Sequence, residues 1–304
     1  RDPDAWTMTP DEIEDWVTRA RAQGCKEALM CLGDKPELAY SSYRTTLASL
    51  GHSTTTEYIY RACDIPLSHG ILPHPNAAVM SRDEMNWLKE VNVSLGIMLE
   101  NISPRLRQRG MAHFSAPDKD PVVRVRMLRE AGALSIPFTT GILIGIGETL
   151  EERVDSLLAI RDIHDEYGHI QEVIVQNFRA KPRTRMAGAP EPESVDMVKT
   201  VAVARLLLGG QMNLQAPPNL SPLDHKLLLR AGINDWGGIS PVTKDYVNPE
   251  AAWPHLNLLA QTCQEEGFTL RERLAIYPEY IDRPGFLRSA LRPRTQELHQ
   301  QVTA

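Results

Sequence analysis

Short apolar runs alternate with segments of helical periodicity along the chain, and loops rich in Gly, Pro or Asn separate them. The first helical segment follows Thr9-Pro10-Asp11-Glu12, which combines a capping hydroxyl, a Pro at the first helical position and a Glu three residues after the cap. Apolar residues then recur at helical spacing, so a helix is predicted between Thr9 and Gly24. Further helix starts are predicted at Ser81, Asp120-Pro121, Thr149 and Ser221-Pro222.

The apolar runs between these helices predict buried strands. Seven such runs occur: Glu27–Leu32, Gly70–His74, Val93–Leu99, Ile136–Ile144, Glu172–Gln176, Met212–Gln215 and a weak Ile233–Trp236. Strands that alternate with helices indicate a parallel sheet, and this number approaches the eight strands of a (β/α) barrel. The predicted fold class is therefore α/β, with a (β/α) barrel or a partial TIM barrel.

The domain organisation follows from the same pattern. We expect a single barrel domain over residues 1–304, with residues 267–304 as a C-terminal extension that packs on the barrel. Because the chain opens on a helix, the first strand and the loop after it are expected upstream of Arg1. Arg1-Asp2-Pro3-Asp4 has neither the basic nor the apolar region of a signal peptide, which favours a cytoplasmic protein.

Composition narrows the classes of function. Hydrophobic residues make up 42% and charged residues 24% of the chain, which excludes disordered and collagen-like proteins. A net charge of -6, without a basic run, argues against binding to nucleic acid or to an anionic membrane. The longest apolar stretch, Ile136–Ile146, contains Pro137 and polar residues, so no transmembrane helix is expected. The four cysteines form no CxxC pair, and we expect reduced, mostly buried thiols.

Polar residues gather where the predicted strands end. They include Asp34, His74, Asn76, Glu100, Glu148, Gln176, Asn177, Gln215, Asn219 and Asp235. The carboxyl ends of the strands form the active site of a (β/α) barrel, so these residues together favour a large polar pocket. Because loops are polar in general, ordinary loop composition explains any one of them taken alone.

One glycine-rich segment, Gly141 to Glu148, runs from a predicted strand into the helix that begins at Thr149. A dinucleotide-binding GxGxxG motif does not fit, because Leu150 stands where the third glycine is required. The glycines permit close approach of the backbone to a flat ligand such as an adenine ring. A simple turn from strand to helix explains them equally.

Three further features suggest binding of a charged ligand. The turn Gly33-Asp34-Lys35-Pro36 exposes backbone groups that can hold an amino or carboxylate group, or it is a plain turn. Glu100 can accept hydrogen bonds from an amine or from hydroxyls. Arg124, four residues after Asp120, can bind a carboxylate or lie solvated on its helix.

These features together resemble the radical S-adenosylmethionine enzymes. Gly141-x-Leu-x-Gly145-x-x-Glu148 resembles their GxIxGxxE element, Gly33 to Pro36 their GGEP turn, and Leu99-Glu100 their fourth-strand carboxylate. Within these enzymes, nearly the full length of the chain is similar to the family that forms deazaflavins. The segments that carry this likeness are 24–29, 32–37, 116–121, 135–149, 169–181, 215–220 and 235–241.

The resemblance implies a cofactor site and a substrate. It implies S-adenosylmethionine and a 4Fe-4S cluster as cofactors, with a flavodoxin or ferredoxin as electron donor and a sister radical enzyme as a separate subunit or fused domain. The expected cofactor-binding residues are Gly33, Asp34, Glu100, Arg124, Gly145 and Glu148. The expected substrate is the adduct of tyrosine's hydroxybenzyl group with 5-amino-6-ribitylaminouracil. Its ring closure, with loss of ammonia, gives 7,8-didemethyl-8-hydroxy-5-deazariboflavin.

A ribityl-uracil has many hydrogen-bond donors and acceptors, and the polar strand ends supply matching groups. The expected catalytic residues are His74, Gln176 and Asn177, and the expected substrate-binding residues are Asn76, Gln215, Asn219 and Asp235. A histidine at such a position is the usual candidate for moving protons near neutral pH. A structural hydrogen bond is the alternative role for His74.

The chain departs from the family pattern at one point, because it contains no CxxxCxxC motif to ligate the cluster. Cys25 and Cys31 bracket a strand and cannot replace it, so no metal ligand is assigned in this chain. The ligands are expected upstream of residue 1, and the chain as given is expected to be inactive without them. Two alternatives stay open: a sister radical enzyme that joins tyrosine to the uracil or acts in menaquinone synthesis, and a non-catalytic truncated barrel that binds a ligand or a partner.

Overall fold

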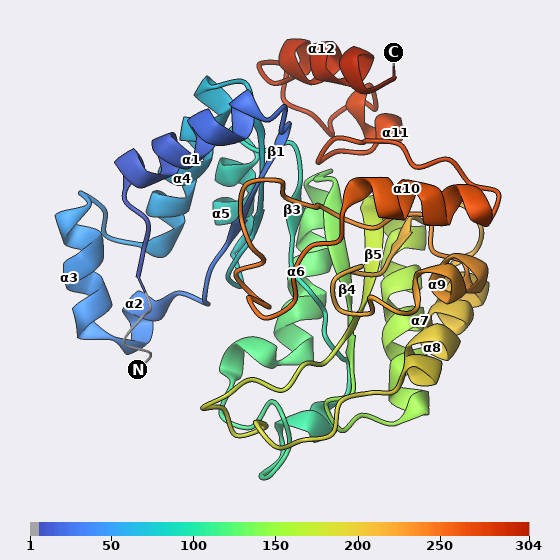
Figure 1. Cartoon of the computed structure of the whole chain (residues 1–304). Coiled ribbons are helices and arrows are strands. Elements are labelled where there is room, and N and C mark those ends of the chain that lie inside the picture. The colour runs from blue at the N-terminus through green and yellow to red at the C-terminus, as the bar shows by residue number, and fades with distance from the viewer. Residues whose placement is uncertain (1–5, 304) are drawn as a thin grey trace. The chain divides into compact units, whose positions relative to one another are not determined.

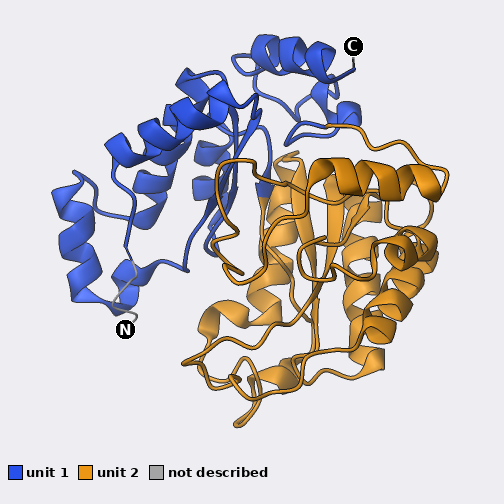
Figure 2. Cartoon of the chain, in the orientation of Figure 1, with its two compact units in different colours: residues 1–95, 273–304 blue, residues 96–272 orange. Residues whose placement is uncertain are grey.

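The computed structural model of the chain describes residues 6–303. It comprises two compact units, one of residues 1–95 and 273–304 and the other of residues 96–272 (Figure 2). We refer to them as unit 1 and unit 2. The expectation based on Arg1 to Asp4 lies outside the described residues, and the single-domain organisation over residues 1–304 stays a prediction.

Six strands are hydrogen-bonded in chain order, from β1 to β6 (Figure 1). They are β1 (Glu27–Cys31), β2 (Leu72–Asn76), β3 (Leu95–Gly96), β4 (Phe138–Ile144), β5 (Ile170–Asn177) and β6 (Leu214–Gln215). In unit 1, β1 pairs with β2 in parallel, and in unit 2 β4 pairs with β5 and β5 with β6 in parallel. The prediction of an α/β fold with a parallel sheet is confirmed.

Three of the predicted strands differ from the structure. The run Met212–Gln215 is a strand only at Leu214–Gln215. The run Ile233–Trp236 forms only a single bridge, between Gln215 and Asp235. The run Val93–Leu99 is a strand only at Leu95–Gly96, because the backbone beyond it bonds to β4 irregularly. There the hydroxyl of Thr140 accepts a hydrogen bond from the amide of Leu99, in place of a backbone carbonyl.

The helices of unit 1 begin largely where their caps predict. They are α1 (Pro10–Ala22), α2 (Pro36–Ala39), α3 (Ser41–Ser49), α4 (Thr55–Ser68), α5 (Arg82–Leu88), α11 (Pro278–Ile281) and α12 (Arg292–Thr303). Thr9 and Ser81 each form a complete capping box, as predicted. A further box at Thr54 and Glu57, which starts α4, has the same sequence signature and was not predicted.

In unit 2 one predicted helix start is wrong. The helices are α6 (Pro121–Ala133), α7 (Leu150–Tyr167), α8 (Ser194–Leu208), α9 (His225–Ala231) and α10 (Leu256–Glu265), with short 3-10 helices at Pro104–Arg107 and Pro117–Lys119. Asp120 and Thr149 cap α6 and α7 as predicted. At Ser221-Pro222 the chain instead makes a turn, closed by the bond from the Asp224 amide to the Ser221 carbonyl, and α9 begins at His225.

Both units have their own buried apolar clusters. In unit 1, Leu274 to Tyr277 pack with Leu72 and Val93, so residues from the two ends of the chain share one core. In unit 2, the side chains of Ile144, Val173 and Val175 on β4 and β5 are fully buried. Burial of each such side chain stabilises the fold by about 1.5–3 kcal/mol.

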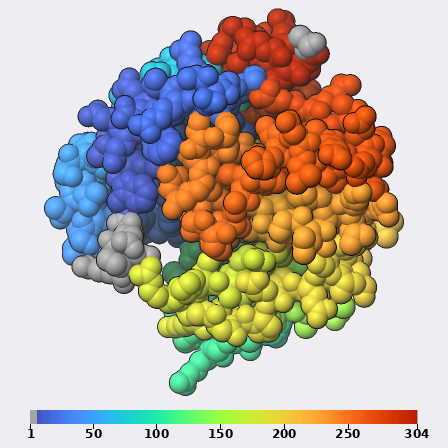
Figure 3. Space-filling model, in the orientation of Figure 1, coloured from blue at the N-terminus to red at the C-terminus, as the bar shows by residue number. Residues whose placement is uncertain are grey.

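Two long loops lie at the surface of unit 2, residues 178–193 in yellow-green and residues 237–255 in orange (Figure 3). They are joined by Lys181, whose ammonium donates to the side chains of Asn248 and Glu250. No helix among residues 6–303 is both long and apolar enough to cross a membrane.

Candidate functional site

The predicted residues of unit 2 follow neighbouring strands at one edge of the sheet. Glu100 bridges to Ile142 of β4, Asn177 ends β5 opposite Ile144, and Gln215 of β6 bridges to Asp235. The strands are parallel, so their carboxyl ends meet at the same edge. The structure thus gathers at this edge Glu100, Gly145, Glu148, Gln176, Asn177, Gln215, Asn219 and Asp235.

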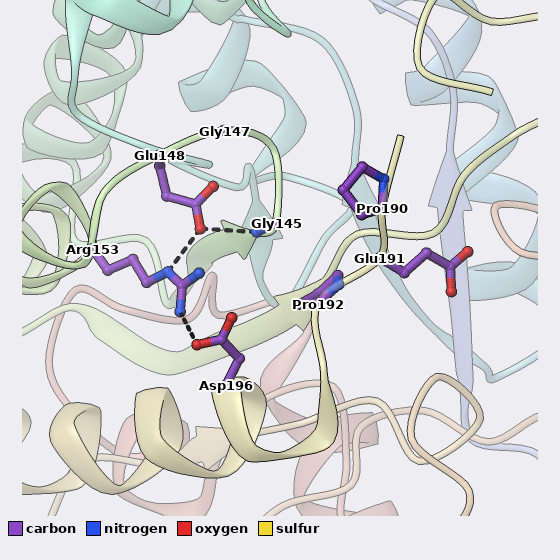
Figure 4. A pocket seen from close by; sticks show the side chains of 8 residues that line it. All are labelled: Gly145, Gly147, Glu148, Arg153, Pro190, Glu191, Pro192 and Asp196. Carbon is purple, nitrogen blue, oxygen red and sulfur yellow. Dashed lines mark hydrogen bonds and ion pairs between the residues drawn. The ribbon is translucent and has the colours of Figure 1, made fainter. Parts of the chain in front are cut away.

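The loop after β4 is held from inside by the carboxylate of Glu148 (Figure 4). The side chain of Glu148 has no exposed surface. Its Oε1 accepts hydrogen bonds from the amide of Gly145 and from Nε of Arg153, at 2.8 and 2.7 Å, and its Oε2 accepts from the amide of Ile146 at 2.8 Å. Glu148 therefore supports the shape of the loop.

Arg153 links this loop to α8. Its guanidinium, with 9% of the side chain exposed, contacts Asp196 at 3.4 Å and the hydroxyl of Thr200 at 3.0 Å. Sequence analysis did not single out Arg153, which lies on the helix after the glycine-rich segment. Glu148 precedes the cap of α7 and Arg153 lies in its first turns, a proximity in sequence that allows such a pair but is not specific.

The glycines of the loop serve two geometric needs. Gly145 has a φ of 88° and Gly147 a φ of 94°, a region that favours glycine. A Cβ on Gly145 would also lie 2.6 Å from Cδ of Pro192. Between this loop and residues 190–192 lies an open pocket of about 250 Å³. Its lining is Gly145, Gly147, Glu148, Arg153, Pro190, Glu191, Pro192 and Asp196 (Figure 4).

Arg105 holds the outer side of the same loop. Its guanidinium donates to the carbonyl of Gly147 at 2.7 Å and to both carboxylate oxygens of Glu152, at 2.8 and 2.6 Å. These hydrogen bonds lower the pKa of Glu152 to about 2. Arg105 was not predicted, because it is far from the loop in sequence.

Glu100 presents one carboxylate oxygen to a lysine and leaves the other without a hydrogen bond among residues 6–303. Its Oε1 accepts from Nζ of Lys119 at 2.6 Å, and the side chain is 13% exposed. The backbone of Glu100 has a φ of 65°, which is uncommon for a residue with a side chain. Such strain is typical of functional positions. Lys119 was not predicted as a site residue.

Arg124 lies beside Glu100 and is buried. Its NH1 atom is 3.9 Å from Oε1 of Glu100 and donates to the carbonyl of Met98, and its Nε donates to the carbonyl of Asp118 at 2.7 Å. The guanidinium thus ties together the segments before and after Glu100. Direct binding of a ligand carboxylate by Arg124 stays a prediction.

Two amides in unit 2 have buried oxygens without a partner. The amide nitrogen of Asn177 donates to the carbonyl of Leu220 at 3.1 Å, and that of Asn219 donates to Asp245 at 2.9 Å. Because these acceptors fix the orientation of each amide, the Oδ1 atoms are the ones left unpaired. Among the described residues neither Oδ1 has a hydrogen-bond partner. Asn177 and Asn219 are 6% and 5% exposed, so the unpaired oxygens favour a further donor.

The remaining predicted residues of unit 2 are Asp235, Gln215 and Gln176. The carboxylate of Asp235 accepts a hydrogen bond from the amide of Gly237 at 2.5 Å. A Cβ on Gly237 would lie 2.2 Å from the amide nitrogen of Gln215, so the two residues are in close contact. Gln176 is half-buried opposite Leu143.

In unit 1 the turn after β1 is anchored to the segment after β2 and to α5. The carboxylate of the exposed Asp34 accepts a hydrogen bond from the amide of Val79 at 2.8 Å. Lys35 has a φ of 39°, and its ammonium contacts Glu84 at 2.7 Å. Gly33 lies in open space, where an added Cβ would meet no atom within 4 Å. The turn is therefore shaped by its neighbours and leaves Gly33 accessible.

β2 has His74 at its middle and Asn76 at its end, on the same face of the strand. The predicted end of this strand at His74 is therefore two residues too early. Nδ1 of His74 is 2.6 Å from the hydroxyl of Ser94. Burial lowers the pKa of His74 to about 3, and the positive charge of Arg273 adds to this shift. The imidazole is therefore neutral at physiological pH. Asn76 is half-buried.

The cysteines do not fit an iron–sulfur cluster. None of the four forms a disulfide; Cys63 and Cys263 are buried, Cys25 is half-buried, and Cys31 is exposed, in contrast to the mostly buried thiols expected. Cys25 and Cys31 lie before and at the end of β1, and Cys63 lies within α4. Among residues 6–303, no three His, Cys, Asp or Glu side chains are placed to hold a metal ion. A 4Fe-4S cluster needs cysteine thiolates, which this arrangement does not supply.

Comparison with curated proteins gives extensive matches. No protein-family model matches the chain. It is 45% identical over 297 residues to 7,8-didemethyl-8-hydroxy-5-deazariboflavin synthase of Methanothermobacter thermautotrophicus, covering 98% of this chain and 89% of that protein. It is 48% identical over 277 residues to the synthase of that name from Methanopyrus kandleri, covering 91% and 83%.

A second group of relatives is much longer. The chain is 53% identical over 278 residues to FO synthase of Mycobacterium tuberculosis, which covers 90% of this chain and 32% of that protein. The chain thus spans about a third of the length of these relatives.

Solved structures support the fold. The chain is similar to methylornithine synthase (PylB), with a TM-score of 0.62 and 17% identity over 88% of this chain and 75% of that one. It is also similar to HydG, a maturase of the [FeFe]-hydrogenase, with a TM-score of 0.65 and 17% identity over 88% and 58%. The α/β fold of the partial-barrel type found in radical S-adenosylmethionine enzymes is confirmed.

Proposed function

Because the chain belongs to the family of 7,8-didemethyl-8-hydroxy-5-deazariboflavin synthases, we propose that it closes the deazaflavin ring. The substrate is the adduct of tyrosine's hydroxybenzyl group with ribitylaminouracil, formally 5-amino-5-(4-hydroxybenzyl)-6-(D-ribitylimino)-5,6-dihydrouracil, and ammonia leaves during ring closure. The observation that carries this proposal is 45% identity across 89% of a synthase of that name. Identity of this extent favours this reaction over that of a sister radical enzyme or a non-catalytic role.

The residues around Glu100 fit S-adenosylmethionine, which supplies the radical that removes hydrogen from the substrate. Glu100 keeps one carboxylate oxygen available to accept hydrogen bonds from the ligand's ammonium or hydroxyls. Lys119 and Arg124 hold the carboxylate in place. Gly145 and Gly147 have no side chain, so a flat ring of the ligand can approach the backbone of this loop and stack on it or form hydrogen bonds with it.

Substrate binding is assigned to the polar strand ends. In unit 2, the unpaired amide oxygens of Asn177 and Asn219 suit N–H or O–H donors, which the uracil and the ribityl chain both carry. Gln176, Gln215 and Asp235 supply further polar groups at the same edge. In unit 1, His74 in the middle of β2 and Asn76 at its end supply further polar groups.

The cluster ligands and the protein partners lie outside these 304 residues in this proposal. The four cysteines do not fit a cluster, so the thiolates come from elsewhere in the protein. The electron donor is a flavodoxin or ferredoxin. A sister radical enzyme acts as a subunit or fused domain, which is supported by the greater length of the FO synthase relatives.

The activity is tested on the full reading frame that contains this chain. We expect the protein, reconstituted with iron and sulfide without oxygen and supplied with reductant, S-adenosylmethionine and the adduct, to form 5′-deoxyadenosine and a fluorescent deazaflavin. The 304-residue chain alone, treated identically, is expected to form neither. A full-length protein that binds a cluster but makes no deazaflavin from the adduct contradicts the proposed reaction.

Replacement of Glu100 tests the cofactor site separately. We expect Glu100→Gln to weaken S-adenosylmethionine binding about ten- to a hundred-fold, because a charge-assisted hydrogen bond is worth about 1.5–3 kcal/mol. Calorimetric titration of the full-length protein measures this. Glu130→Gln, which removes the same charge from α6 beside Arg126, is the matched control. Equal affinities of the two variants would assign Glu100 a purely structural role.

A further inference from the structure

In unit 1, Ser94 lies between the His74 imidazole and the backbone of the C-terminal segment. Its hydroxyl oxygen is 2.6 Å from Nδ1 of His74 and 2.5 Å from the carbonyl oxygen of Ala275. Ser94 has no exposed surface and His74 is 6% exposed. Both contacts are therefore made inside the protein, where each donor and acceptor must be matched.

Counting protons assigns the roles of the three groups. A carbonyl oxygen only accepts, so the single hydroxyl proton of Ser94 is donated to Ala275. The reverse arrangement would set two oxygen lone pairs 2.5 Å apart in a buried place. The Ser94 hydroxyl has no second proton, so Nδ1 of His74 must carry the proton between them. A neutral imidazole with its proton on Nδ1 has a bare nitrogen at Nε2.

We propose that Ser94 is a positioning residue, which holds His74 as the Nδ1–H tautomer so that Nε2 accepts a hydrogen bond from an N–H or O–H group of the substrate. Among residues 6–303, the hydrogen bond that His74 makes is the one at Nδ1, so Nε2 is left for a ligand. The identity of the substrate rests on the proposed function, and the tautomer rests on the geometry alone.

The electrostatics of this part of unit 1 agree with a neutral acceptor. Burial and the positive charge of Arg273 both disfavour the imidazolium form. Nε2 therefore binds donors, such as an amine, a phenol hydroxyl or a ring N–H, and does not donate to a carbonyl.

The tautomer is measured directly by nitrogen NMR of the full chain labelled with ¹⁵N-histidine. The signals of His74, one of nine histidines, are identified by their loss in His74→Gln. We expect a protonated Nδ1 and a bare Nε2 at neutral pH. A signal for the Nε2–H form in the unaltered protein overturns the proposal, whatever the variants do.

Ser94→Ala then tests whether the hydroxyl sets the tautomer. We expect the Nδ1–H signal to decline in favour of Nε2–H, and Ser94→Thr, which keeps the hydroxyl, to restore it. Ser156→Ala is the matched control, since Ser156 is equally buried and donates to the Glu152 carbonyl at 2.6 Å in unit 2. An unchanged His74 signal in Ser94→Ala contradicts the positioning role.

The substrate part has a separate readout. We expect Ser94→Ala to weaken binding of the tyrosine–ribitylaminouracil adduct about tenfold in calorimetry, while Ser156→Ala leaves it unchanged. Unaltered affinity in Ser94→Ala contradicts the acceptor role of Nε2. If the unaltered full-length protein does not bind the adduct, the proposed function and the substrate role fail together, and the NMR result on Ser94 still decides the tautomer.

Discussion

Glu148→Ala is expected to lower the free energy of unfolding by about 3 kcal/mol or more, although Glu148 belongs to a segment that resembles a cofactor-binding element. Its buried carboxylate neutralises Arg153 and accepts from the amides of Gly145 and Ile146. Without it, two backbone donors and a buried guanidinium lose their partner. Asp196 and Thr200 still contact Arg153, which places the expected loss at the lower end of the range for a broken buried pair.

Urea unfolding of the unaltered protein and of Glu148→Ala, followed by circular dichroism, measures this loss. Glu151→Ala is the matched control, since Glu151 is exposed on the first turn of α7, and its removal is expected to change the unfolding free energy by less than about 0.5 kcal/mol. Glu148→Gln keeps the shape but offers only one oxygen, so an intermediate loss is expected. Equal stability of Glu148→Ala and Glu151→Ala would show that the carboxylate does not support the loop.

In the GxIxGxxE-like segment, Gly145 and Glu148 determine the shape of the loop. Glu148 holds the turn from inside, and the positive φ of Gly145 and its approach to Pro192 leave no room for a side chain. A ligand bound here would contact a surface that these residues shape. A sequence motif of this kind therefore reports the shape of a loop as much as the direct contacts of a cofactor.

Much of the fold could be predicted because its signals are local. The capping boxes at Thr9, Ser81 and Thr149 each need only four adjacent residues, and all three form. The predicted cap at Ser221 is wrong because a Ser-Pro pair also suits a turn, and Asp224 closes one there. The irregular backbone around Glu100 depends on bonds to β4, which no local pattern contains.

The site shows the same division between local and distant causes. Polar strand ends follow from the alternation of elements, so Glu100, Asn177 and Asn219 could be selected from the sequence. Their partners could not, because Asp245 reaches Asn219 from a long loop and Ala275 reaches Ser94 from the C-terminal segment. Hydrogen bonds between residues so far apart in sequence depend on the tertiary fold, and no local sequence pattern predicts them.

Gly141→Ala is expected to cost about 3 kcal/mol or more, because the neighbouring strand occupies the place of the added methyl group. A Cβ on Gly141 would lie 2.1 Å from the carbonyl oxygen of Ile174, its partner on β5. That oxygen belongs to the backbone of a buried strand and cannot turn aside as a flexible side chain would. Relief requires β4 and β5 to move apart, with loss of hydrogen bonds along the ladder.

The control is another glycine to which a methyl group can be added freely. Gly210 meets no atom within 4 Å of an added Cβ, so Gly210→Ala is expected to be neutral or slightly stabilising. Urea unfolding compares the two variants, and the yield of soluble protein serves if Gly141→Ala is too unstable to purify. Because Glu100 bonds to Gly141 through its amide, at 3.1 Å, a displaced β4 also disturbs the carboxylate at the candidate cofactor site. Gly141→Ala with the stability of Gly210→Ala would mean that the strands accommodate a side chain at this point, and the first glycine of the segment would then need another explanation.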